Sequence, residues 1–216
     1  FHDPLKHIKF LRQSLSQDKK PIGFFLSAGC PLSVQMPKDK WPLIPDVERL
    51  TKFVHEELKS KKGEAKNNYD KLLEEVTKAK KNINNIEDIL SFIRGMQQVA
   101  AGNTIRGFKE EDLLKLEKDI CTKIVTKLDV SLPDQTSPFH RIASWVSSID
   151  REKPIEIFTT NYDLLLEQAF EELSVPYFDG FVGSRQSFFD LRALEDNLIP
   201  KHWTRLWKIH WIGRPN

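Results

Sequence analysis

The spacing of apolar residues changes near residue 160, and this change predicts a strand followed at once by a helix. Residues 155–157 alternate apolar with polar and then run apolar into Phe158, a pattern typical of a strand with at least one buried face. After Asp163 the apolar residues recur at helical spacing, at Leu165, Leu166, Ala169 and Phe170. We therefore expect Asp163 to be the helix N-cap and Glu167 and Gln168 to face solvent.

Further strands are predicted on both sides of this junction. The apolar stretches at residues 21–26 and 206–210 each have the composition of a core strand. Residues 175–178 form a shorter candidate whose Pro176 favours the edge of a sheet. Because strands alternate with helical patterns, the sequence predicts an α/β fold with a Rossmann-like parallel sheet and right-handed crossovers.

The middle of the chain, residues 66–128, shows helical patterns and no strand signal. Its three apolar stripes consist of Tyr69, Leu72, Leu73 and Val76; Ile86, Ile89, Leu90, Ile93 and Met96; and Leu113, Leu116, Ile120, Ile124 and Leu128. Residues 47–58 and 138–149 predict two further amphipathic helices. We therefore expect one domain over residues 1–216 with a helical insertion at 66–128.

Composition narrows the classes of function. The 216 residues include 33 basic and 31 acidic side chains, so the net charge of +2 does not indicate a nucleic-acid partner. No apolar run approaches the length of a membrane span, and we expect no membrane partner. Cys30 and Cys121 are too few for a disulfide framework or a four-cysteine zinc site, and the six His are scattered. We therefore expect a cytoplasmic protein without a metal.

Polar or small residues follow three of the predicted strands. They are the loop at residues 27–33, the turn at 159–163, and His210. The carboxyl ends of parallel strands share one rim, where ligands bind in open α/β sheets. We therefore expect this rim to position a dinucleotide, although Asn161 and His210 considered singly are more typical of turn and packing residues.

These residues resemble the sirtuin family. The family's Gly-Ala-Gly loop is similar to Phe25-Leu-Ser-Ala-Gly29. Its Thr-x-Asn-x-Asp motif is similar to Thr159-Thr-Asn-Tyr-Asp163, and its Lys-x-His-Gly strand end is similar to Lys208-Ile-His210. The resemblance covers residues 21–58 and 139–210. It is strongest for the sirtuin-like NAD hydrolases of bacterial anti-phage defence, because no cysteine lies between the Asn motif and the His strand to build a deacylase zinc module.

The resemblance implies roles at the Asn motif and the last strand. NAD is the expected substrate, and its cleavage gives nicotinamide and ADP-ribose. Asn161 is expected to hold the attacking water or the ribose, and His210 to act as general base or to orient the ribose. Asp163 is expected to contact the carboxamide, and Thr160 belongs to the same site.

The resemblance also implies a loop for the cofactor phosphates. Ser27, Ala28, Gly29 and Cys30 are expected to let the pyrophosphate approach the backbone. Cys30 is more typical of a small packing residue than of a nucleophile. Asp46 lies in a proline-rich stretch similar to the family's cofactor-covering segment, but it equally suits the N-cap of the next helix.

The sequence departs from the family at two places. Ser27 stands where the family has its first glycine, and Trp211 follows His210 where the family continues Gly-Ser. We expect a flexible loop to be missing there and the domain to continue beyond Asn216.

The resemblance implies partners as well. A homo-oligomer is expected, together with a HerA-like ATPase, an Argonaute or another defence sensor. Two other functions stay open: a non-catalytic module that binds NAD or ADP-ribose, and an NAD-dependent protein deacylase or ADP-ribosyltransferase.

Overall fold

The computed structural model describes residues 3–60, 63–100, 102–195 and 198–209. The chain forms two compact units. The sheet unit comprises the described residues of Phe1–Leu43 and Ser131–Trp211, and the helical unit comprises those of Ile44–Val130. The candidate rim belongs to the sheet unit.

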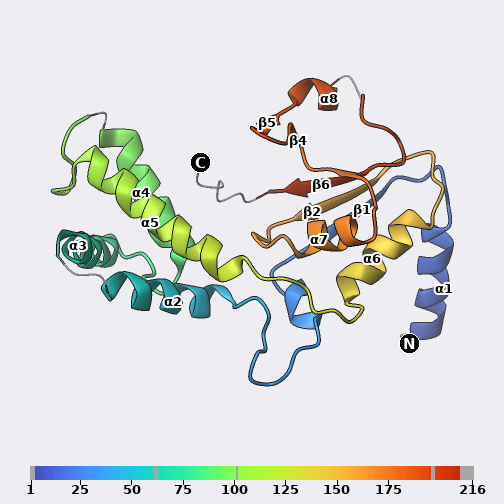
Figure 1. The fold of residues 1–216 in the computed structure, drawn as a ribbon, viewed down its shortest axis with the longest axis horizontal. Coiled ribbons are helices and arrows are strands. Elements are labelled where there is room, and N and C mark those ends of the chain that lie inside the picture. The colour runs from blue at the N-terminus through green and yellow to red at the C-terminus, as the bar shows by residue number, and fades with distance from the viewer. Residues whose placement is uncertain (1–2, 61–62, 101, 196–197, 210–216) are drawn as a thin grey trace. The chain divides into compact units, whose positions relative to one another are not determined.

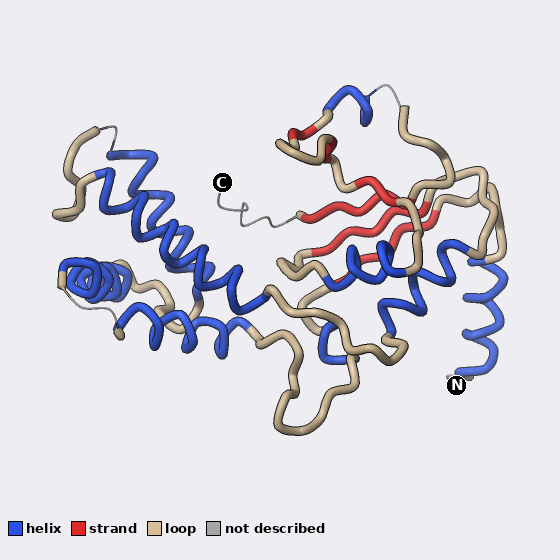
Figure 2. Tube along the Cα trace, viewed as in Figure 1, coloured by secondary structure: helices blue, strands red, loops and turns tan. Residues whose placement is uncertain are grey.

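The sheet unit is built on a four-stranded parallel sheet (Figures 1 and 2). Its strands are β1 (Ile22–Leu26), β2 (Ile155–Thr159), β6 (Thr204–Lys208) and β3 (Tyr177–Phe178), in that spatial order. The predicted α/β fold class with a Rossmann-like parallel sheet is confirmed, and β3, which follows Pro176, lies at an edge as expected.

Two helices cover one face of this sheet, α6 (Pro138–Ser147) and α7 (Leu165–Glu172) (Figure 1). On this face the β1 residues are half-buried, and Ile157 of β2 and Leu206 of β6 are fully buried at 0% exposure. Phe24 of β1 meets Trp145 of α6 edge to face, with ring centroids 5.6 Å apart. The apolar stripes predicted from the sequence therefore form the core between the sheet and these helices.

The opposite face of the sheet is more open. Phe25, Phe158 and Trp207 stand in one row across β1, β2 and β6. Phe25 is 63% exposed, and the other two are half-buried. Parallel sheets are usually buried on both faces, so this row is an unusual exposed surface.

The remaining elements of the sheet unit include several that the sequence pattern did not predict. They are α1 (Pro4–Leu15), the 3-10 helix η1 (Cys30–Ser33), the antiparallel pair β4 (Phe181–Val182) and β5 (Phe188–Phe189), and α8 (Leu191–Glu195). The hairpin was missed because its strands have two residues each, too few to show a period. Helix α1 was not predicted although Leu5, Ile8, Leu11 and Leu15 recur at helical spacing, and the structure buries none of residues 4–15.

The helical unit contains α2 (Val47–Lys59), α3 (Glu64–Lys78), α4 (Ile86–Ala100) and α5 (Glu110–Leu128). The stripes predicted for residues 66–128 are confirmed as its buried core. Helix α2 precedes the predicted insertion but packs against α3, α4 and α5. None of the helices within the described ranges is long and apolar enough to cross a membrane.

A buried polar network joins three of these helices. Thr51 Oγ1 accepts a hydrogen bond from the N–H of Ile86 at 2.9 Å. His55 Nε2 lies 2.9 Å from the carbonyl oxygen of Ile83, and His55 Nδ1 lies 2.8 Å from the hydroxyl of Tyr69. The carbonyl requires a donor, so Nε2 carries the proton and Nδ1 accepts from Tyr69. Burial lowers the pKa of His55, which keeps this arrangement neutral.

Candidate functional site

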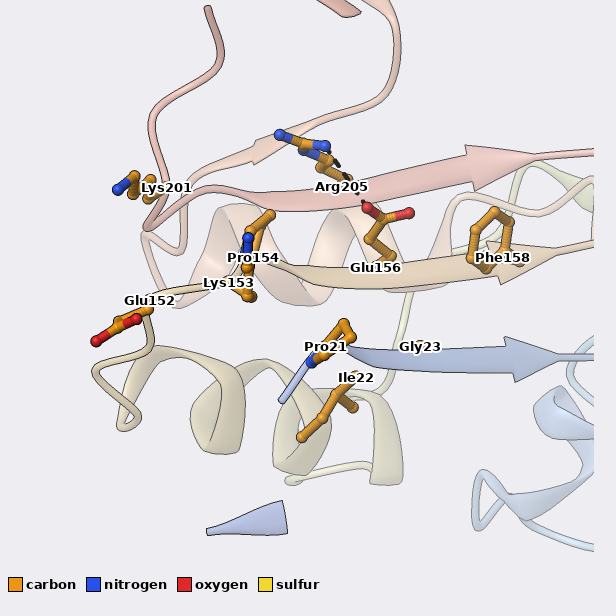
Figure 3. A pocket seen from close by; sticks show the side chains of 10 residues that line it. All are labelled: Pro21, Ile22, Gly23, Glu152, Lys153, Pro154, Glu156, Phe158, Lys201 and Arg205. Atoms are coloured by element: carbon orange, nitrogen blue, oxygen red, sulfur yellow. Dashed lines mark ion pairs between the residues drawn. The ribbon is translucent and has the colours of Figure 1, made fainter. Parts of the chain in front are cut away.

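The strand register brings the predicted site loops to one edge of the sheet. Leu26 pairs with Thr159, and Thr159 pairs with Lys208, so β1, β2 and β6 end side by side. Figure 3 shows the arrowheads of these three strands pointing the same way. The loop after β1, the turn after β2 and Ile209 therefore share one rim. His210, the predicted base, lies outside the described residues.

The loop after β1 is open and tightly turned. Ser27, Ala28 and Gly29 are exposed, and Cys30 is half-buried with a free thiol. The N–H of Cys30 donates to the carbonyl oxygen of Ser27 at 2.9 Å and starts η1. Gly29 has φ −76°, and no heavy atom of the described residues lies within 4 Å of a Cβ built on it. Neither the backbone conformation nor contacts with the described residues require glycine at this position. The free space beside Gly29 can therefore admit a ligand.

Asn161 occupies the turn after β2. Its N–H donates to Thr159 Oγ1 at 3.0 Å, and the carbonyl oxygen of Thr159 accepts from the N–H of Ile209 at 2.8 Å. Asn161 is 9% exposed. Its Oδ1 is buried and has no hydrogen-bond partner within the described part of the chain. Buried polar atoms are nearly always paired, so this oxygen is the strongest indication of a ligand at the rim.

Asp163 ends the turn and is 6% exposed. Its Oδ1 accepts from the N–H of Leu165 at 3.2 Å. The predicted N-cap position is wrong by one residue, because α7 begins at Leu165 and Leu164 is its cap. Burial raises the pKa of the Asp163 carboxyl, against the opposing effects of the Leu165 N–H and the charge of Lys208.

Two charged residues that the sequence did not predict complete the turn. Lys208 Nζ lies 2.8 Å from Glu167 Oε1, and it also donates to the carbonyl oxygen of Asp163. The side chains of Lys208 and Glu167 are 15% and 10% exposed. Burial raises the pKa of Glu167, while the Lys208 charge opposes that change.

The prediction that Glu167 faces solvent is wrong, because the first turn of α7 lies against the end of β6. A signal was present in the sequence: Lys208 precedes His210 by two residues in the motif, and Glu167 follows Asp163 by one helical turn.

Asp46 lies in the helical unit, where it is the N-cap of α2. Its Oδ1 accepts from the N–H of Arg49 at 2.8 Å. This is the alternative role that the sequence offered for it, and its expected part in cofactor binding stays a prediction. Among the described residues, no group of three or more His, Cys, Asp or Glu could hold a metal ion.

A pocket of about 680 Å³ lies at the other end of the sheet, near the amino ends of β1, β2 and β6 (Figure 3). Charged side chains line part of it, and Arg205 Nη1 lies 3.5 Å from Glu156 Oε1. Glu156 also accepts from the indole N–H of Trp207 at 3.3 Å. None of the predicted site residues lines this pocket, so it is distinct from the rim.

Comparison with known families supports the resemblance over part of the chain. A family model described as a SIR2-like domain matches residues 155–213. The match runs from β2 through the Asn161 turn and α7 to β6, and so contains the orphaned amide oxygen and the Lys208–Glu167 pair. No curated protein matches the chain. The match supports a sirtuin-like domain and an NAD-related activity.

Proposed function

We propose that this sirtuin-like domain hydrolyses the bond between nicotinamide and ribose in NAD, releasing nicotinamide and ADP-ribose. The observation that carries the proposal is the buried Oδ1 of Asn161 at the carboxyl rim of the sheet, which has no hydrogen-bond partner among the described residues. An amide oxygen that is desolvated but unbonded in the fold is available to a hydroxyl or water of a bound substrate.

The residues of the rim have chemistry that suits NAD. The exposed backbone at Ser27, Ala28 and Gly29 gives a pyrophosphate access to N–H groups, and the space above Gly29 allows close approach. Thr160 is half-buried beside Asn161, where its hydroxyl suits contact with a ribose. Cys30 lies in the same loop, and we assign it packing against the cofactor rather than nucleophilic attack.

We assign Asn161 the role of orienting the attacking water. In the reaction the water oxygen forms a bond to the anomeric carbon as the carbon–nitrogen bond to nicotinamide breaks. The bonding electrons leave with nicotinamide, which becomes neutral, and the proton of the water passes to a base. His210 is the proposed base or ribose-orienting group. Holding the water in line lowers the barrier by fixing the reactants in a reactive geometry.

Asp163 is assigned recognition of the nicotinamide carboxamide. One of its oxygens already accepts from Leu165, which fixes the orientation of the carboxyl group. The raised pKa of Asp163 favours a protonated carboxyl more than in water. A protonated carboxyl can donate to the carboxamide oxygen, and an ionised one can accept from the carboxamide NH₂.

The test is NAD turnover by the protein at its natural length, with nicotinamide and ADP-ribose separated by chromatography. Asn161→Ala should lose at least about 100-fold in kcat, as expected for removal of one preorganised polar group. Asn103→Ala, at an exposed turn of the helical unit, is the matched control and should keep full activity. Full turnover by Asn161→Ala would refute the assignment.

The same assay separates the other functions. NAD or ADP-ribose binding without product would identify a non-catalytic module. Turnover that requires an acylated or acceptor protein would identify a deacylase or an ADP-ribosyltransferase. The sequence has no cysteine between Asn161 and His210 for a zinc module, which disfavours deacylation.

We further propose that the activity serves anti-phage defence by depleting NAD in the cytoplasm. The resemblance to defence-associated sirtuin-like hydrolases supports this role. It also supports a homo-oligomer that works with a HerA-like ATPase, an Argonaute or another sensor. Phage infection of cells that carry the system should lower cellular NAD, and Asn161→Ala should abolish that fall. An equal fall of NAD in the variant would exclude this role.

A further inference from the structure

We infer that Lys208 and Glu167 are positioning residues that hold the turn carrying Asn161 in its reactive geometry. The inference rests on the proposed hydrolysis of NAD for its effect on rate. It assigns neither residue a contact with substrate.

The Lys208 ammonium group ties three segments together. Lys208 is the last residue of β6, and it pairs in register with Thr159 at the end of β2. Its Nζ donates to the carbonyl oxygen of Asp163, which ends the turn, and lies 2.8 Å from Glu167 Oε1 in the first turn of α7. One cation therefore joins the strand end, the turn and the helix.

The turn is thus held at both of its ends. At the beginning, Thr159 accepts from Ile209 through its carbonyl and from Asn161 through its hydroxyl, at 2.8 and 3.0 Å. At the end, Lys208 binds the Asp163 carbonyl. Asn161 lies between these two ties, and its Oδ1 has no bond of its own among the described residues. The position of the Asn161 amide therefore depends on the hydrogen bonds of Thr159 on one side and of Lys208 on the other.

The chemistry of the pair favours a role in specifying geometry. A buried ion pair is often no more stabilising than two apolar side chains of similar volume, because both charges must be desolvated. A lysine that donates to a backbone carbonyl oxygen fixes the position of that carbonyl. An apolar residue has no donor and cannot do this. A displacement of about 1 Å at a reacting group can cost roughly 100-fold in rate.

The first measurement is steady-state NAD cleavage by the protein at its natural length. We expect Lys208→Met to lower kcat by at least about tenfold with a smaller change in KM, because the substrate contacts remain and their alignment is lost. Lys208→Arg, which keeps a cation and several donors, should recover part of the kcat. Lys78→Met is the matched control, because Lys78 forms a 2.7 Å pair with Glu75 on the helical unit and should leave kcat unchanged.

A double variant separates positioning from stability. Lys208→Met leaves the Glu167 carboxylate buried without its cation and should lower the Tm. Adding Glu167→Leu removes that charge and should raise the Tm again. Because the Asp163 carbonyl still lacks its donor, the double variant should keep a low kcat. Recovery of kcat together with Tm would overturn the inference and leave the pair a purely structural role.

A measurement without substrate makes the inference independent of activity. Hydrogen exchange of the amides at residues 160–165 should be at least about tenfold faster in Lys208→Met than in the parent, while Lys78→Met should match the parent. If the parent protein cleaves no NAD under any condition, the proposed function fails, whatever the exchange rates. If the parent cleaves NAD and Lys208→Met changes neither kcat nor exchange, the positioning role is overturned.

Discussion

Asn161→Ala should separate function from stability, because its buried side chain has an oxygen that bonds to none of the described residues. Asn161 is 9% exposed, and its Oδ1 lacks a hydrogen-bond partner among the described residues. At most buried positions, truncation to alanine lowers stability together with activity. Here we expect activity to fall while the free energy of unfolding stays close to that of the parent.

Two opposing effects set the magnitude. Leaving a buried polar atom unpaired costs about 1–3 kcal/mol, and the substitution removes that cost. Truncation also removes packing and leaves a cavity, at about 24 cal/mol for each Å³ that does not collapse. The backbone bond from Asn161 to Thr159 persists in alanine. The change in unfolding free energy should therefore lie within about 1 kcal/mol, a Tm change of roughly 4 °C or less.

Thermal and denaturant unfolding of the parent and the variant measure this change, and NAD turnover measures activity on the same samples. The loss in kcat should be about 100-fold or more. Thr159→Val is the comparison, because it removes the hydroxyl that accepts from Asn161 and should cost about 1–3 kcal/mol of stability. A stability loss above about 3 kcal/mol in Asn161→Ala would refute the reasoning and show that the side chain is structural.

Three further predictions concern the parts that support the rim and the helical unit. Because the folded pKa of His55 is lowered, the helical unit should be most stable above the ordinary value of 6.5 and lose stability as pH falls below it. Unfolding between pH 8 and 5 should show this slope, and His55→Gln should flatten it. Arg151 donates hydrogen bonds to the carbonyl oxygens of Leu15, Gln17 and Lys20. Arg151→Ala should therefore release α1 and speed proteolytic cleavage in the segment that follows this helix. An unchanged rate of cleavage would contradict this anchoring role. Ile157→Ala leaves a cavity at a fully buried position and should lower the free energy of unfolding, measured with denaturant, by about 2–5 kcal/mol. A decrease below about 1 kcal/mol would contradict the place of Ile157 in the core.

The elements that the sequence predicted well are those whose apolar residues repeat over several turns or alternate along a strand. The stripes of residues 66–128 became the helical core, and residues 155–158 became the second strand, because burial of one face requires that spacing. The hairpin of β4 and β5 has no such repeat, and α1 buries none of residues 4–15. A two-residue strand is too short to show a period. In α1, Leu5, Ile8, Leu11 and Leu15 recur at helical spacing without being buried, so this helix was overlooked rather than unpatterned.

The sequence by itself determined the α/β class, the order of the four sheet strands and of the helices that pack on them, and the motif that contains Asn161. These follow from local periodicity and from residues that lie close together in the chain. The tertiary structure decided which polar groups meet. Only the parallel register places Lys208 beside the turn and buries Glu167 against it. In the same fold, the Asn161 oxygen has no hydrogen-bond partner within the described part of the chain. Hydrogen bonds and desolvation depend on distances in space between residues far apart in the chain, and apolar spacing does not encode those distances.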